Sequence, residues 1–285
     1  PHKLQLNERT SLTLLAQLRK DPDSGFYNQM PTSGTLTYNP NGQISSKFYG
    51  GQPGFDSYER KQGSIGYQFR HDFNDTVTFR QNLRYISSTG DYLMVYPWGV
   101  HADAPLIDRY SMNLQETMVN FAVDNQAEFH LQTGPVQHTL LAGIDRMHSS
   151  VRSRAGYGDA SPINYLNPDY STPVEVPAFT SSTHSTLDQT GFYLQDQLEW
   201  ANWIMNLAGR YDAAKTKSTN LLTDARTESN DYATTGRAGL LYHFDNGLAP
   251  YVSYSTSFVP SSTTDFYGHG FKPTEGKQTE MGLKY

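Results

Sequence analysis

The side chains that most often carry catalysis or bind metals are spaced here without a familiar pattern. The chain has 9 His and no Cys, which excludes disulfides, thiolate metal sites and Cys nucleophiles. No two histidines have the spacing that places two ligands on one helix face. The pairs His138–Asp145 and Arg210–Asp212 could act as acid and base, although we favour ion pairs on a polar strand face. We therefore predict that the chain is not an enzyme and carries no cofactor or metal of its own.

Aromatic residues are the second group that could form a site. They make up 13% of the chain, with 20 Tyr and 3 Trp. Tyr and Trp combine a large apolar surface with one hydrogen-bonding group, which suits ligand binding. Several lie in segments that look like loops, among them Tyr27, Tyr96, Trp98 and Tyr157. Such rings either face a ligand or pack on their neighbours, and the residues alone leave both open.

Composition limits the classes of partner. The net charge is −6 and no basic stripe is present, which argues against nucleic acid. Only 36% of residues are hydrophobic, and the mean hydropathy is −0.62. No apolar run approaches the roughly 20 residues of a membrane helix, but membrane β-barrels leave no such signal.

Long alternating strands position these residues. In residues 114–131, Phe121, Val123 and Phe129 share one face, while Asp124 and Glu128 share the other. The hairpin 233–258 turns at Asp245-Asn246-Gly247, where Asn-Gly supplies the positive φ angles of a tight turn. About ten strands are expected, at residues 10–19, 58–69, 76–88, 114–131, 136–149, 187–200, 203–215, 233–244, 251–258 and 276–285. Short turns alternate with long loops at residues 20–57, 89–113, 150–184, 216–230 and 259–275.

Two architectures fit this alternation. In a soluble β-sandwich the apolar face would be the core, whereas in a membrane barrel it would meet lipid. Strand length favours the barrel, because ~9–11 tilted residues cross a bilayer. The charges agree, since an Arg at mid-bilayer would cost ~2–4 kcal/mol. They fall on the polar face at Arg80, Arg84, Asp124, Glu128, Asp145, Arg210, Arg237, Glu280 and Lys284. The fold predicted is all-β, an antiparallel up-and-down transmembrane β-barrel.

Several stretches resemble one family, the TonB-dependent outer-membrane receptors, and within it the ferric-hydroxamate (ferrichrome and ferrioxamine) group. The resemblance covers nearly the whole chain outside the long loops. It rests on residues 138–145 (HTLLAGID), 190–197 (TGFYLQDQ), 207–212 (LAGRYD), 244–247 (FDNG), 250–255 (PYVSYS), 257–262 (SFVPSS), 271–273 (FKP) and 276–285 (GKQTEMGLKY).

The resemblance implies a 22-stranded barrel around an N-terminal plug, in the bacterial outer membrane. Residues 1–285 would be part of that barrel domain, with the plug, the TonB box and the closing strands outside the chain. The implied partners are a ferric siderophore, outer-membrane lipid and, through the plug, the TonB complex. Phages and colicins bind the long loops of this family, so the resemblance also implies a phage or a colicin as a partner of this chain. A passive porin is the alternative function, alongside a soluble β-sandwich binding module.

The same resemblance implies the ligand-binding residues. Iron would arrive already chelated, so the protein would supply contacts to the complex and no metal ligands. Residues 25–31 (GFYNQMP) resemble the aromatic first-loop segment of the family, with Tyr27 at its Tyr and Gln29 where a Trp is usual. Residues 96–100 (YPWGV) resemble its Tyr-x-Tyr-Gly-Val loop, so Tyr96 and Trp98 would face the ligand. In residues 155–157 (AGY) the family can carry an aromatic before the Gly, but Ala155 stands there, which leaves Tyr157 as the candidate.

Overall fold

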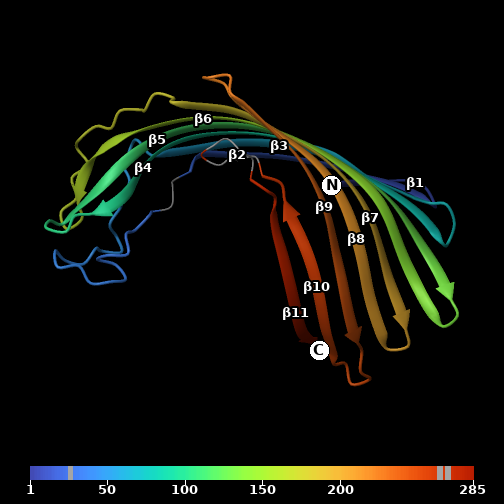
Figure 1. The fold of residues 1–285 in the computed structure, drawn as a ribbon. Coiled ribbons are helices and arrows are strands. Elements are labelled where there is room, and N and C mark those ends of the chain that lie inside the picture. The colour runs from blue at the N-terminus through green and yellow to red at the C-terminus, as the bar shows by residue number, and fades with distance from the viewer. Residues whose placement is uncertain (25–27, 262–265, 267–270) are drawn as a thin grey trace.

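The chain forms one large antiparallel sheet in which every strand pairs with its neighbours in sequence. The structure is a computed structural model, and it describes residues 1–24, 28–261, 266 and 271–285. Eleven strands follow one another across the sheet (Figure 1). They are β1 (His2–Asn7), β2 (Thr10–Ser24), β3 (Ser57–Asp72), β4 (Val77–Val100), β5 (Leu106–Thr133), β6 (Val136–Asn164), β7 (Ser181–Trp200), β8 (Trp203–Asn220), β9 (Arg226–Tyr242), β10 (Ala249–Val259) and β11 (Thr274–Lys284).

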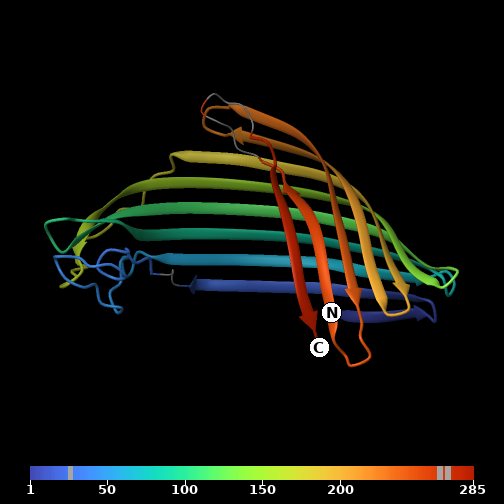
Figure 2. The same ribbon diagram turned by 60° about the horizontal axis from the view of Figure 1, so that its bottom comes forward.

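The sheet is strongly curved, and its connections are sorted between its two ends. Short turns lie along one end, and the longest connections lie at the other (Figures 1 and 2). No second sheet packs on this one within the described residues, which makes the sandwich alternative wrong. The described part of the chain also contains no helix long and apolar enough to cross a membrane.

The two faces of the sheet differ as the alternation predicts. The interior face carries the predicted charges, because the paired register places Asp124 opposite Asp145, and both share the face of Asp212. Side chains crowd there, and Asp212 is only 1% exposed. The outer face presents Ile144, Phe192, Leu194, Leu207 and Tyr211, all exposed. Crowding on one side and exposure on the other indicate that the polar face is the concave one.

Strands β4, β5 and β6 are longer than predicted, at 24, 28 and 29 residues. At ~3.3 Å per residue they span roughly 80–95 Å, far more than a bilayer needs. The connection 101–105 is therefore short, where the sequence predicted a loop over 89–113. The predicted loop over 216–230 likewise shrinks to 221–225. The alternation stops where lipid no longer covers one face, so these extensions carry no strand signal.

Two further differences concern the first strand and the NG turn. Strand β1 is missing from the prediction because its six residues leave little room for a pattern. At the turn, Gly247 has the expected positive φ of 86°, but Asn246 does not share it. The Asn246 side chain instead accepts a hydrogen bond from the Leu248 amide at 3.1 Å. Backbone bonds also close the turn, from the Phe244 amide to the Leu248 carbonyl at 2.8 Å and from the Gly247 amide to the Phe244 carbonyl at 3.0 Å, and the connection runs over residues 243–248.

Polar residues that interrupt the outer face have partners there. The Tyr67 hydroxyl donates to Gln81 at 2.6 Å, and the Gln81 amide donates to Asn125 at 2.6 Å. Nearer the short turns, His138 contacts Asp196 at 2.8 Å, so the predicted His138–Asp145 pair is wrong. We call the exposed apolar residues of the outer face, such as Ile144, Phe192 and Leu194, the apolar belt. Beyond it, Arg146 pairs with Asp188 on the outer face. The charges predicted for the polar face all lie on it, and other charged residues occupy the outer face at its margins.

Candidate ligand site

Four aromatic side chains gather on the interior face beyond the apolar belt. They come from three neighbouring strands: Tyr96 and Trp98 from β4, Tyr110 from β5 and Tyr157 from β6. Tyr96 lies directly opposite Tyr110, with ring centroids 6.2 Å apart. Trp98 meets the edge of Tyr110 at 6.1 Å. We call these four residues the aromatic platform.

The register places the platform on the face that carries the interior charges. Tyr96 is an even number of residues from Arg80 and Arg84 along β4, and alternate residues share a face. Tyr157 lies opposite Met112, two residues along β5 from Tyr110. The pairing of β4 with β5 shifts between Pro97 and Gly99, and such a bulge re-aims the side chain beside it. The extra residue is Trp98, whose contact with Tyr110 keeps it on the platform.

The platform is open to a ligand. Trp98 is 74% exposed, Tyr157 is 58% exposed and Tyr110 is 38% exposed. Exposed rings on a rigid sheet lose little conformational freedom when a ligand covers them. Together they form an apolar surface edged by phenol hydroxyls, which can contact a compact ligand without binding a metal ion directly.

The structure moves three of the predicted site residues from loops to strands. Tyr96 and Trp98 lie on β4, and Tyr157 lies on β6. Loop positions for them are therefore wrong, although the structure brings the three residues together on one face. Gln29 lies in the 28–56 segment, with its carbonyl oxygen close to Gly50, which also approaches Pro97 of β4. Tyr27 lies outside the described residues, so its role stays a prediction.

Tyr110 is the platform residue that sequence reasoning missed. It was assigned to a loop, so no cross-strand partner was considered for it. The available signal was the sequence Asp103-Ala104-Pro105, which can turn the chain between two extended segments. A hairpin centred there would have set Tyr110 against Tyr96.

A charged network on the interior face lies nearer the short turns. Arg80 pairs with Glu128 through two bonds of 2.7 and 2.8 Å. Arg210 bridges Asp145 and Asp212 and forms an ion pair with each. A Cβ at Gly191 would lie 1.9 Å from the Arg210 guanidinium, so a larger residue there would displace that side chain from its two carboxylates.

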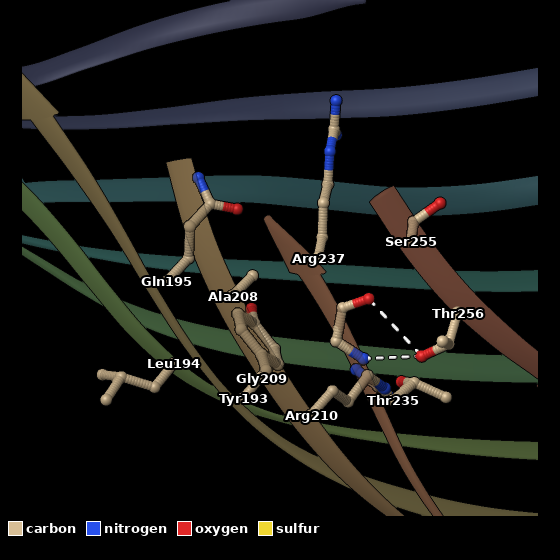
Figure 3. Close-up of a pocket in the computed structure, with 11 residues that line it drawn as sticks. Tyr193, Leu194, Gln195, Ala208, Gly209, Arg210, Thr235, Arg237, Ser255 and Thr256 are labelled. Atoms are coloured by element: carbon tan, nitrogen blue, oxygen red, sulfur yellow. Dashed lines mark hydrogen bonds between the residues drawn. The ribbon is translucent and has the colours of Figure 1, made fainter. Parts of the chain in front are cut away.

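The network borders a hollow of about 370 Å³ on the interior wall, drawn in Figure 3. It is lined by Tyr193, Gln195, Arg210, Thr235, Arg237 and Ser255. Figure 3 shows Arg237 extended away from the sheet, while Thr256 accepts a bond from the Gly236 amide at 2.9 Å. No group of three or more His, Cys, Asp and Glu able to hold a metal occurs among the described residues. The lining combines polar side chains with a larger share of apolar surface, which suits contact with another polypeptide segment or a solute.

Comparison with known proteins decides the family. The chain matches the family model described as TonB dependent receptor-like, beta-barrel, over residues 3–285. The chain belongs to this family. The TonB-dependent receptor-like barrels are receptors and transporters of the bacterial outer membrane, which confirms the predicted fold class and location.

Relatives within the family have informative names. The chain is 38% identical over 281 residues to the ferrioxamine B receptor of Salmonella typhimurium strain SL1344, covering 99% of this chain and 40% of that protein. It is 36% identical over 307 residues to the ferrichrome outer membrane transporter/phage receptor of Escherichia coli K12, covering 98% of this chain and 41% of that protein. The chain thus spans about two fifths of the length of these relatives.

Solved structures agree on the fold. The structure of BauA, the ferric preacinetobactin receptor of Acinetobacter baumannii, matches 99% of this chain and 43% of its own, with a TM-score of 0.80 and 19% identity. The open form of the ferric-catecholate import receptor Fiu from E. coli K12 matches 99% of this chain and 48% of its own, with a TM-score of 0.77 and 18% identity. These likenesses show the barrel fold alone.

Proposed function

We propose that the chain is part of an outer-membrane receptor that takes up ferric hydroxamate siderophores. The observation that carries the proposal is the aromatic platform, which offers four rings on one interior face. The relatives named for ferrioxamine and ferrichrome support the ligand class. In this proposal iron is cargo inside its chelator, and the protein supplies no metal ligands.

The energetics require more than the platform. Nanomolar binding corresponds to about −12 kcal/mol. Each aromatic ring buried against the ligand contributes ~1.5–3 kcal/mol before the cost of association is subtracted. Further contacts must therefore come from elsewhere in the receptor, with Tyr27 and Gln29 as candidates within this chain. The plug domain outside this chain is the other source, and it would also connect the receptor to TonB.

Uptake in whole cells tests the proposal. Cells lacking their own hydroxamate receptors would express the full-length protein and be given ⁵⁵Fe-loaded ferrichrome or ferrioxamine. We expect uptake that requires an intact tonB gene and falls in a Trp98→Ala/Tyr110→Ala variant of equal surface abundance. Uptake that persists without TonB would contradict the proposal and favour the passive porin. A liposome-swelling assay would then show general solute permeability.

A further inference from the structure

We propose that a hydrogen-bonded cluster behind the aromatic platform holds the platform in its ligand-ready arrangement, with Arg109 as the positioning residue. The cluster consists of Arg109, Gln52, Asp56 and Tyr49, and we call it the rear cluster. It lies on the opposite face of β4 and β5 from the platform. The inference rests on the proposed function, because it concerns the same binding site.

Arg109 is the most deeply buried cation of the site, at 3% exposure. Its guanidinium donates to the carbonyls of Gly51 at 2.8 Å and Ser161 at 2.9 Å. It also reaches the Gln52 side chain at 3.2 Å. These acceptors belong to the 28–56 segment and to β6, so one side chain of β5 ties both of them to the strand.

Gln52 and Asp56 extend the connection on either side. Gln52 is 5% exposed and donates to the carbonyl of Tyr170 at 2.9 Å, in the connection after β6. The Asp56 carboxylate accepts hydrogen bonds from two backbone amides, that of Val95 in β4 at 2.6 Å and that of Gln52 at 2.6 Å. The Tyr49 hydroxyl also donates to Asp56. Burial and this carboxylate raise the pKa of the Tyr49 phenol far above its ordinary value, so the donor stays protonated.

An apolar core reinforces the same side of the wall. Ile107 and Ile163 of the strands pack with Ile44 and Phe48 of the 28–56 segment and with Tyr165. Ile107 is two residues from Arg109 along β5 and, like it, is buried. The 28–56 segment is therefore a packed layer behind the platform.

Strand residues that contact or belong to the rear cluster alternate with the platform residues along β4 and β5. Val95 precedes Tyr96, Pro97 separates Tyr96 from Trp98, and Arg109 precedes Tyr110. Pro97 pairs directly with Arg109 across the two strands. On its other side, a Cβ at Gly50 would lie 3.1 Å from the Pro97 ring, so the backbone of the 28–56 segment approaches the bulge closely. A shift of the rear cluster must therefore move the strand positions that carry the rings.

The hydrogen bonds of Arg109 indicate that it orients the neighbouring segments and adds little stability. Its hydrogen-bond acceptors are neutral carbonyl and amide oxygens, and none of the ion pairs among the described residues includes it. Burying a charge without a paired carboxylate gains little stability over an apolar side chain of similar size. A planar guanidinium, however, fixes three acceptors in one geometry. That geometry joins β5 and β6 to the 28–56 segment directly behind the platform.

The test uses full-length receptor with Arg109→Met, Arg109→Lys and Gln52→Leu, and exposed Arg19→Met as the matched control. Ferrichrome and ferrioxamine are titrated, and acrylamide quenching of Trp98 is taken as the difference between each receptor and its Trp98→Phe form. We expect Arg109→Met to lower affinity at least about tenfold, because ring positions shift. We also expect Trp98 quenching to change, with Arg109→Lys intermediate and Arg19→Met unchanged.

A double variant separates positioning from general destabilisation. In a Tyr110→Ala background, Arg109→Met should change affinity by less than about twofold, since the two residues act as a unit. Full additivity, or unchanged affinity and quenching in Arg109→Met, would overturn the proposal. If Arg109→Met fails to assemble, as judged by its heat-modifiable band in gels, Gln52→Leu carries the same test. If the parent receptor binds neither siderophore, the proposed function fails, while the Trp98 quenching still decides the positioning role.

Discussion

Tyr110 and Trp98 are the residues on which ligand binding depends most directly in this account. Tyr110 contacts both Tyr96 and Trp98, so it is the centre of the platform. Removing its ring should weaken ferric-siderophore binding roughly ten- to a hundredfold, given ~1.5–3 kcal/mol for a buried aromatic. Equilibrium titration of Tyr110→Ala measures the loss. Tyr38→Ala is the control, because Tyr38 is an exposed aromatic of the 28–56 segment outside the platform. Equal affinities of the two variants would contradict the assignment.

Arg210 is the residue on which the interior wall depends. Its guanidinium bridges Asp145 and Asp212, and Gln189 also donates to Asp212 at 2.8 Å. Arg210→Met would leave two carboxylates without their cation, which costs ~3–5 kcal/mol when such a pair is buried. The variant should therefore unfold at a lower temperature than the parent receptor, as followed by its heat-modifiable band in gels. Lys217→Met, at an exposed ion pair, should leave that temperature unchanged. A normal unfolding temperature in Arg210→Met would show that the bridge adds no stability.

At the scale of single strands, β7 offers a matched pair of neighbours. Leu194 lies on the outer face and Gln195 on the interior face, because odd-numbered residues of β7 share the face of Asp145 and Asp212. Leu194→Arg should destabilise the barrel by ~2–4 kcal/mol if lipid covers that face. Gln195→Arg adds the same side chain one residue away, beside a wet interior, and should be tolerated. Denaturant titration of receptor folded in lipid vesicles measures both. The reverse order of stabilities would mean that the faces have been assigned the wrong way round.

The sequence predicts the strands best where lipid imposes a pattern. Phe121, Val123 and Phe129 had to alternate with Asp124 and Glu128, because one face meets hydrocarbon and the other meets water. The same alternation correctly predicts the interior position of Arg210. Within the apolar belt, period and charge therefore identify both the strands and their faces.

Beyond the belt the same reasoning fails for a physical reason. Strand β4 continues to Val100, and β5 begins at Leu106, although neither extension alternates clearly. One of their faces is covered by the 28–56 segment and the other is the aromatic platform, so both can be apolar. The sequence could not show which residues pair across β4 and β5. Tyr96 and Trp98 were found through family resemblance, while Tyr110, Arg109 and Gln52 depend on contacts that only the folded chain reveals.

At the scale of the whole molecule, the sheet has two edges. Strands β1 and β11 each pair on one side only among the described residues. Unpaired backbone groups are not tolerated in hydrocarbon, so membrane sheets close into barrels. Residues 1–285 expressed alone should therefore form no heat-modifiable, protease-resistant band in detergent or vesicles, whereas the full-length receptor should. A stable monomeric band from the isolated chain would contradict this expectation and mean that it closes a barrel by itself.

The most direct test of the central claim is a fluorescence titration of full-length receptor with ferrichrome, ferrioxamine and ferric coprogen. The account predicts saturable quenching by at least one of the three, with most of the signal lost in Trp98→Phe because that ring lies on the platform. Iron-free forms of the same chelators serve as the control for nonspecific quenching. Failure of all three ferric complexes to bind, by a well-folded receptor, would contradict the assignment of this barrel to ferric hydroxamates.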